Sequence, residues 1–237
     1  MDLTSILFLD IETVSGKASY NELNEDFQEL WQLKMKSIYR KEEPPVPEEA
    51  YEDKAGIFAE FGKIVCISVG ILTKDSEGNL SMRLKSYAHD DESILLKEFS
   101  DLLEKNRKLI RLCGHNIREF DIPYICRRLI INQLPLPRML DISGKKPWEL
   151  EYLMDTMLMW RFGDYKNYTK LSLLTAVFGI PTPKDDIDGS EVGRVYWQEK
   201  DLERIAIYCQ KDVVAVAQLV LKFQRLDLIP EENVHYT

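Results

Sequence analysis

The sequence predicts an α/β fold in which a mixed β-sheet is flanked by helices. Three observations support this class. Apolar runs rich in β-branched residues open the chain, segments with helical spacing of apolar residues follow, and a strand-like segment recurs among the helices. A chain of 237 residues that is 45% hydrophobic and 30% charged is long enough for one sizeable domain. We therefore expect a single domain over residues 1–237.

The first half of the chain predicts a three-stranded meander. The apolar run from Ser5 to Val14 is typical of a buried strand, and residues 63–73 and 79–89 flank the turn sequence KDSEG as in a hairpin. Between the first two strands, residues 16–62 look like an insertion. Its segment NEDFQELWQLKMKSIYRK has helical spacing, and EEPPVPEE is too rich in proline to continue that helix.

The second half of the chain is mostly helical. The predicted elements are a helix over 91–106, a strand in 109–116, a helix that starts at Asp121, a helix over 169–179 closed by Gly179, a polar loop over 181–194 and a long helix over about 199–225. Pro123 lies in the first turn of its helix, where proline is tolerated. Residues 148–160, WELEYLMDTMLMW, fit a strand or a helix equally well.

The net charge, the N-terminal residues and the cysteines restrict the class of protein to which this chain can belong. The net charge of -9 does not describe a protein that coats nucleic acid nonspecifically, although it leaves room for a local site whose carboxylates are masked by cations. The N-terminus has no basic leader and carries acids in its apolar run, so we expect neither a signal peptide nor a membrane span, and we expect the cytoplasm. The four cysteines are widely spaced and read as reduced packing residues: Cys66, Cys113, Cys126 and Cys209.

Two carboxylates stand in the first strand. Asp10 and Glu12 of FLDIET are two residues apart, so they project from the same face of the strand. Burying two like charges costs several kcal/mol per ion unless a cation lies between them, and Mg²⁺ and Mn²⁺ prefer such oxygen ligands. The pair is therefore a candidate half of a metal site, although a strand can also simply end in solvated acids.

Two further segments carry candidate residues. Asp121 of GHNIREFDIPYICRR stands where a loop meets a helix, and taken alone it reads as an N-cap. Tyr208 and Asp212 of YCQKD are four residues apart in the final helix, so a phenol and a carboxylate lie one turn apart on the same side. Taken alone, Tyr208 reads as a packing residue and Asp212 as a solvated position.

FLDIET, GHNIREFDIP and YCQKD, in this order, resemble the three exonuclease motifs of the DEDD superfamily, and particularly those of the proofreading exonuclease domain of family B DNA polymerases. The resemblance spans Asp10 to Asp212. Tyr208 fills the tyrosine position and Ile207 the place of a histidine, which indicates the tyrosine type. His115 departs from the aromatic residue usual in the second motif, and the insertion at 16–62 has no counterpart in the motifs. Because no polymerase follows Thr237, we expect a freestanding relative.

The resemblance implies a ribonuclease H-like fold and a metal-dependent 3′-5′ exonuclease. Hydrolysis of a phosphodiester needs an activated water and neutralisation of charge on the attacking and leaving oxygens, which two metal ions supply. The implied cofactors are two Mg²⁺ or Mn²⁺ ions. Asp10 would bridge them, Glu12 and Asp212 would hold the ion that activates water, and Asp121 would hold the other directly or through water. Tyr208 would orient the water with Glu12, since a phenol with a pKa near ~10 is a poor base.

The implied substrate is the 3′ end of single-stranded or frayed DNA, with RNA or a noncatalytic nucleic-acid-binding scaffold of the same fold as alternatives. Asn116 could hydrogen-bond the terminal nucleotide, and Phe120 could stack on it or anchor the loop in the core. Asp155 reads as a helix cap or as a residue that supports a ligand, and it is left out of the metal set. Six basic residues are candidates for guiding the strand: Arg127, Arg128, Lys145, Lys146, Lys166 and Lys170.

Overall fold

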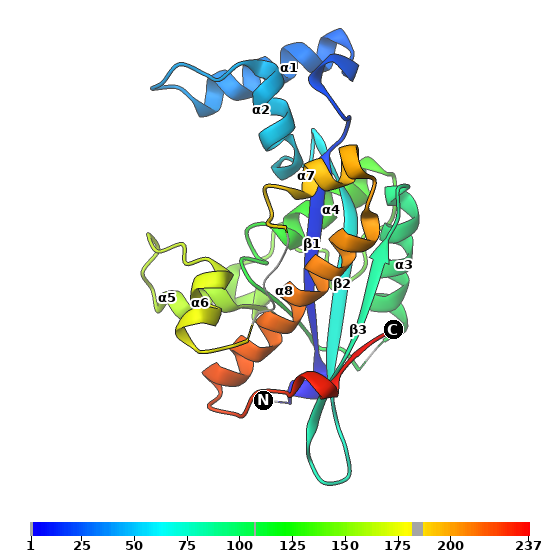
Figure 1. The fold of residues 1–237 in the computed structure, drawn as a ribbon, viewed down its shortest axis with the longest axis vertical. Helices are drawn as coiled ribbons and strands as arrows, with labels where there is room; N and C mark the ends of the chain where they lie inside the picture. Colours follow the sequence, from blue (N-terminus) through cyan, green and yellow to red (C-terminus); the bar gives the residue numbers. More distant parts are fainter. Residues whose placement is uncertain (1, 107, 182–186) are drawn as a thin grey trace.

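A computed structural model describes residues 2–106, 108–181 and 187–237, and it contains a mixed sheet with helices on both faces (Figure 1). The strands are β1 Ile6–Ser15, β2 Gly62–Lys74, β3 Leu80–Ala88, β4 Arg111–Gly114, β5 Leu153–Asp155 and β6 Val234–Tyr236. Their order across the sheet is β5-β4-β1-β2-β3-β6. The predicted α/β class is confirmed.

The meander predicted from the first half of the chain is present. β1 pairs antiparallel with β2, and β2 pairs antiparallel with β3. On the other side of β1, β4 and then β5 add in parallel. β6, which no sequence pattern predicted, pairs in parallel with β3 at the opposite edge. A strand of three residues is too short to show a period-two pattern, so pairing with β3 alone defines it.

Helices cover the sheet as the apolar spacing predicts. Their bounds are α1 Glu25–Ile38, α2 Pro47–Lys54, α3 Glu92–Lys105, α4 Asp121–Ile131, α5 Thr156–Arg161, α6 Leu171–Val177, α7 Val192–Arg194 and α8 Leu202–Phe223. Leu7 and Leu9 of β1 pack in the core cluster that contains residues of α3 and α4. Ile6 and Phe8, which alternate with them, pack against the buried face of α8. β1 is therefore covered on both faces.

The structure resolves one segment that was ambiguous in sequence and corrects one predicted loop. Residues 148–160, ambiguous in sequence, contain both β5 and α5, and the chain changes from strand to helix at Asp155. The polar loop expected over 181–194 is already helical at α7, and a π-helical turn over Val195–Glu199 precedes α8. Residues 182–186 of that loop lie outside the described residues. Gly179 ends the α6 segment with a φ of 61°, as predicted.

Residues 16–62 form a helical lobe with a core of its own. Figure 1 shows α1 and α2 beyond the end of β1 and β2. Trp31 and Tyr51 are fully buried there and meet edge to face, with ring centroids 5.4 Å apart. Pro47 begins α2 at a position where its missing amide costs nothing, so the proline-rich segment separates two helices. The lobe thus buries Trp31 and Met35 of α1 without extending the sheet.

Candidate active site

Asp10 and Glu12 continue the row of β1 side chains that faces α8. They follow Ile6 and Phe8 in the period-two alternation, and the strand register places them opposite Ser68 and Cys66 of β2. A β-bulge between Glu12 and Thr13 ends this regular row. Glu12 is buried and Asp10 is partly buried. The two carboxylates therefore share one face of a central strand, as the sequence predicts.

Asp121 is the first residue of α4, and its carboxylate is 4% exposed. The N-cap position belongs to Phe120, whose side chain makes no capping hydrogen bond, so the capping interpretation of Asp121 is wrong. Burial raises the pKa of Asp121 to about 7, with nearby Asp155 and Asp212 adding to the rise, while backbone amides of Asp121 and Ile11 act in the opposite direction. The Ile11 contact places this carboxylate beside β1.

Asp155 holds the loop that leads to Asp121. Its carboxylate accepts hydrogen bonds from the backbone amides of Asn116 at 3.0 Å and Arg118 at 3.2 Å. The same carboxylate caps α5 by accepting from the amides of Met157 and Leu158. Both readings made from the sequence therefore apply: Asp155 is a helix cap, and it supports the segment that positions a candidate ligand.

α8 brings the third motif to the same place. Cys209, on the face of α8 that packs on the sheet, lies with its Sγ 3.5 Å from Oδ2 of Asp10. One ligand atom from each of Asp10, Glu12 and Cys209 lies within 4.8 Å of the other two. Tyr208 is partly buried and packs against the apolar cluster that contains Cys209, and Asp212 follows one turn later on the helix.

The four predicted acids are close enough to repel one another. Burial raises the pKa of Asp10 well above its usual range, and Asp121, Glu12 and Asp212 raise it further. Burial also raises the pKa of Glu12, to which Asp212 and Asp121 add. Asp10 thus feels the charge of the other three acids, and Glu12 that of Asp121 and Asp212. The structure brings together residues that are up to 202 positions apart in the sequence.

This donor set fits hard divalent cations. All four acids offer carboxylate oxygens, the ligands that Mg²⁺ and Mn²⁺ prefer, and their mutual repulsion disappears when cations lie between them.

Cys209 was read from the sequence only as a packing residue, yet its thiol borders the acids. The sequence could have indicated that Cys209 lies near the site, because this residue has the helical spacing of the buried face of α8 and is adjacent to Tyr208. Burial raises the pKa of this thiol, so the neutral form is favoured.

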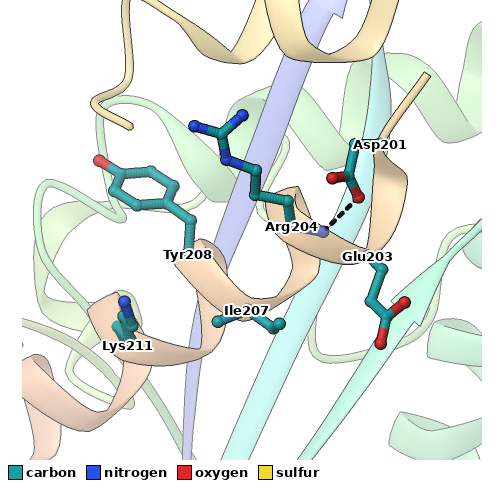
Figure 2. Close-up of a pocket in the computed structure, with 6 residues that line it drawn as sticks. All are labelled: Asp201, Glu203, Arg204, Ile207, Tyr208 and Lys211. Atoms are coloured by element: carbon teal, nitrogen blue, oxygen red, sulfur yellow. Dashed lines mark hydrogen bonds between the residues drawn. The ribbon is translucent and has the colours of Figure 1, made fainter. Parts of the chain in front are cut away.

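A pocket of about 270 Å³ opens along α8 beside Tyr208 (Figure 2). Figure 2 shows Tyr208, Arg204 and Lys211 on one side of the helix and Glu203 on another. The backbone amide of Arg204 donates to Asp201 at 3.0 Å, and its guanidinium donates to Glu199 at 2.6 Å. The tyrosine of the third motif is therefore reached from a pocket that also presents two cationic side chains.

The remaining predicted residues have mixed outcomes. Asn116 lies in the loop before α4 with a φ of 63°, a conformation that asparagine tolerates. Phe120 packs on the main core and on Tyr124, with ring centroids 5.4 Å apart, so its anchoring role is present and its stacking role stays a prediction. The nitrogens of His115 lie 2.9 Å from Oγ1 of Thr156 and 2.8 Å from the carbonyl oxygen of Thr169. That histidine therefore links two loops.

The prediction that Arg128 guides the nucleic acid strand is wrong. Its guanidinium donates to both carboxylate oxygens of buried Glu92, at 2.6 Å from Nη2 to Oε2, and to the carbonyl oxygen of Ala59 at 2.7 Å. Glu92 also accepts from the amide of Ile64. This ion pair ties α3, α4 and β2 together, which is a structural role.

The carboxylate cluster predicts an unusual dependence of stability on pH. The pKa of an aspartate in the unfolded chain is about 3.9, and that of Asp121 in the folded protein is about 7. At pH values between these two limits, folded Asp121 holds a proton that the unfolded chain has released. The free energy of unfolding of the metal-free protein should then fall by about 2 kcal/mol, or roughly 4–8 °C in Tm, from about pH 5 to pH 7. Thermal denaturation in EDTA across this range measures the effect.

Asp121→Asn is the matched control, because it removes the titrating group and keeps the shape. The pKa of His115 is lowered by burial, which acts in the opposite direction below about pH 6.5, and the variant leaves that contribution in place. The difference between wild type and variant therefore reports the Asp121 carboxylate together with the rise that it causes in the pKa values of Asp10 and Glu12. Added Mg²⁺ should raise the Tm of the wild type more at about pH 8 than at about pH 5. Parallel pH profiles for the two proteins would contradict this interpretation.

Fold and site together define an α/β protein with a ribonuclease H-like sheet and a carboxylate cluster at its central strand. One similar solved structure is the family B DNA polymerase from the hyperthermophilic archaeon Pyrobaculum calidifontis, with a TM-score of 0.51 and 17% sequence identity. The similarity covers 92% of this chain and 24% of the polymerase chain, so this chain spans about a quarter of that protein. At this level of identity the likeness shows the fold.

The family follows from the sequence match. Residues 57–232 match a family described as a predicted 3′-5′ exonuclease related to the exonuclease domain of PolB, and the chain belongs to this family. The matched range contains Asp121, Tyr208 and Asp212, while Asp10 and Glu12 precede it. The resemblance drawn from the three motifs is therefore confirmed.

No curated protein sequence matches this chain. Among the described residues, no helix is long and apolar enough to cross a membrane.

Proposed function

We propose that this protein is a metal-dependent exonuclease that removes nucleotides from the 3′ end of single-stranded or frayed DNA. The observation that carries the proposal is the mutual repulsion of Asp10, Glu12, Asp121 and Asp212, four acids from three separate elements. Membership of a family of predicted 3′-5′ exonucleases supports the reaction class. A cluster of buried carboxylates would only weaken a passive nucleic-acid binder, because it repels phosphates.

Asp10, Glu12, Asp121 and Asp212 would hold two Mg²⁺ or Mn²⁺ ions. Bound cations would activate a water molecule and neutralise charge on the attacking and leaving oxygens. The protein contributes a rigid cage: Asp10 and Glu12 are fixed by β1, and Asp121 by α4 and the loop that Asp155 holds. Asp212 completes the set from α8.

Tyr208 would act as a hydrogen-bonding group for the attacking water, together with Glu12. A phenol with an ordinary pKa near ~10 keeps its proton at neutral pH, so it can donate a hydrogen bond and orient an oxygen. Its place next to Cys209 on α8 and at the edge of the pocket in Figure 2 supports this role. Asn116, whose backbone is held by Asp155, would contact the terminal nucleotide with its amide, and Phe120 would support it from the core side.

DNA is the proposed substrate because the similar solved structure is that of a DNA polymerase. We also propose the cytoplasm as the site of action. All four cysteines are free thiols, which suits a reducing compartment.

The test uses matched DNA and RNA single strands, each labelled at the 5′ end or at the 3′ end, incubated with Mg²⁺ or Mn²⁺. The proposal predicts stepwise shortening of 5′-labelled DNA, immediate release of a labelled nucleotide from 3′-labelled DNA, and no reaction in EDTA. Slower shortening of the RNA strand is expected. Cleavage inside the strand, release from the 5′ end or turnover in EDTA would refute the mechanism, and faster degradation of RNA would refute the choice of substrate.

A further inference from the structure

The segment between α5 and α6 exposes three aromatic rings to solvent. We define the aromatic loop as residues 162–168, with the sequence FGDYKNY. Phe162 is 91% exposed, Tyr165 80% and Tyr168 63%. Single exposed apolar residues are ordinary on protein surfaces, but three aromatics within seven residues form a cluster.

The backbone of this loop holds Phe162 in a costly conformation. Phe162 ends α5 with a φ of 45°, in the left-handed region that costs a residue with a Cβ roughly 1–2 kcal/mol. Because the ring is exposed, packing within the chain does not repay this cost. An exposed aromatic side chain held in a strained position indicates a contact with something outside the chain.

The loop is tied to the candidate active site. Buried Arg161 donates to the carbonyl oxygen of Asn167 at 2.8 Å and pairs with Glu119 of the second motif at 3.3 Å. His115 of the same motif lies 2.8 Å from the carbonyl oxygen of Thr169. α5 and α6, which carry the loop, also pack against α8. Figure 1 shows these two helices beside α8.

Distance and charge both suit a nucleic acid strand. α5 begins after Asp155, the residue that holds the loop before Asp121, and its six residues span about 9 Å. Residues 161–170 carry three basic side chains and one acidic side chain in a protein of net charge -9. The guanidinium of Arg161 lies 4.1 Å from the centroid of the Tyr168 ring. Exposed rings interleaved with cations are the pattern that binds unpaired bases and their phosphates.

We propose that the aromatic loop is a stacking platform for single-stranded DNA upstream of the 3′ end that enters the active site. The proposal rests on the exonuclease function proposed above. Phe162 and Tyr165 stack on bases, Lys166 contacts the backbone, and Arg161 keeps the platform fixed to the second motif. Lys166, which the sequence predicted to guide the nucleic acid strand, would do so from this loop.

The test measures binding without cleavage. Fluorescence anisotropy in EDTA gives the Kd of a labelled oligothymidylate of about 15 nucleotides, a length within the ~4–16-nucleotide site sizes of single-strand-binding folds. Phe162→Ala and Tyr165→Ala should each weaken binding about tenfold. Phe162→Leu combined with Tyr165→Leu keeps apolar area without a ring face and should weaken binding nearly as much. Tyr236→Ala, an exposed aromatic on β6 at the opposite sheet edge, should leave the Kd unchanged.

The outcomes separate this inference from the proposed function. A change of less than twofold in a variant that combines Phe162→Ala with Tyr165→Ala overturns the platform, even if the protein proves to be an exonuclease. Binding that depends on both rings supports it, even if no nuclease activity is found. A matched oligouridylate that binds the wild type more tightly than the DNA overturns the choice of partner.

Discussion

Asp10→Asn should abolish measurable shortening of DNA while leaving the fold intact. The other three acids all raise the pKa of Asp10, so the amide variant loses one of the four carboxylates that would hold the cations. Loss of residues that merely orient metal ligands costs 10–100-fold, so loss of a ligand should reduce turnover by more than about 100-fold. Initial rates on a 5′-labelled single strand in Mg²⁺ measure the effect.

Metal binding by the same variant separates a catalytic defect from misfolding. Isothermal titration with Mn²⁺ should show weaker binding to Asp10→Asn, while its metal-free Tm should equal or exceed that of the wild type because one repelling charge is gone. Tyr208→Phe is the matched comparison: it should slow turnover roughly 10–100-fold with metal binding unchanged. An Asp10→Asn protein that keeps more than about a tenth of wild-type activity would contradict the assignment.

Arg128→Ala should be the most damaging single substitution for stability outside the core. It leaves Glu92 as a buried charge without its bidentate partner, and breaking such a pair costs about 3–5 kcal/mol. For a domain of this size the Tm should fall by roughly 6–20 °C. Thermal or urea denaturation at neutral pH measures the change.

The double variant Arg128→Met with Glu92→Gln tests the reason for that loss. Removing both charges avoids an unpaired buried ion, so its Tm should lie above that of Arg128→Ala. The position also matters for the site, because the ion pair anchors α4, which carries Asp121 at its start. If Arg128→Ala lowered the Tm by less than about 2 °C, the pair would be only a surface contact.

The motifs and the sheet centre could be predicted because both depend on local chemistry. Alternation along FLDIET places Asp10 and Glu12 on one face, and a one-turn spacing places Tyr208 and Asp212 together. The resemblance to polymerase exonuclease motifs then joined segments that spacing alone could not join. The strand β6 and the role of Arg128 could not be predicted, because each depends on a partner distant in sequence, β3 and Glu92.

Asp121 and Asp155 show that contacts between residues distant in sequence could not be predicted at the site either. Local pattern alone favoured a cap for Asp121, the motif resemblance made it a metal ligand, and both left Asp155 open. In the structure Asp155 caps α5 and also holds the loop before α4. The capping role is local, while the loop contact joins residues 39 positions apart. Cys209 had a visible packing pattern, but its place beside Asp10 depends on how α8 crosses β1.

The convergence of four carboxylates on a pair of cations is tested most directly by anomalous X-ray diffraction from crystals of the protein grown with Mn²⁺. We expect two anomalous peaks, both bounded by oxygens of Asp10, Glu12, Asp121 and Asp212, with the Asp10 carboxylate touching both. Manganese bound elsewhere, or at this place by side chains outside that set, would contradict the account.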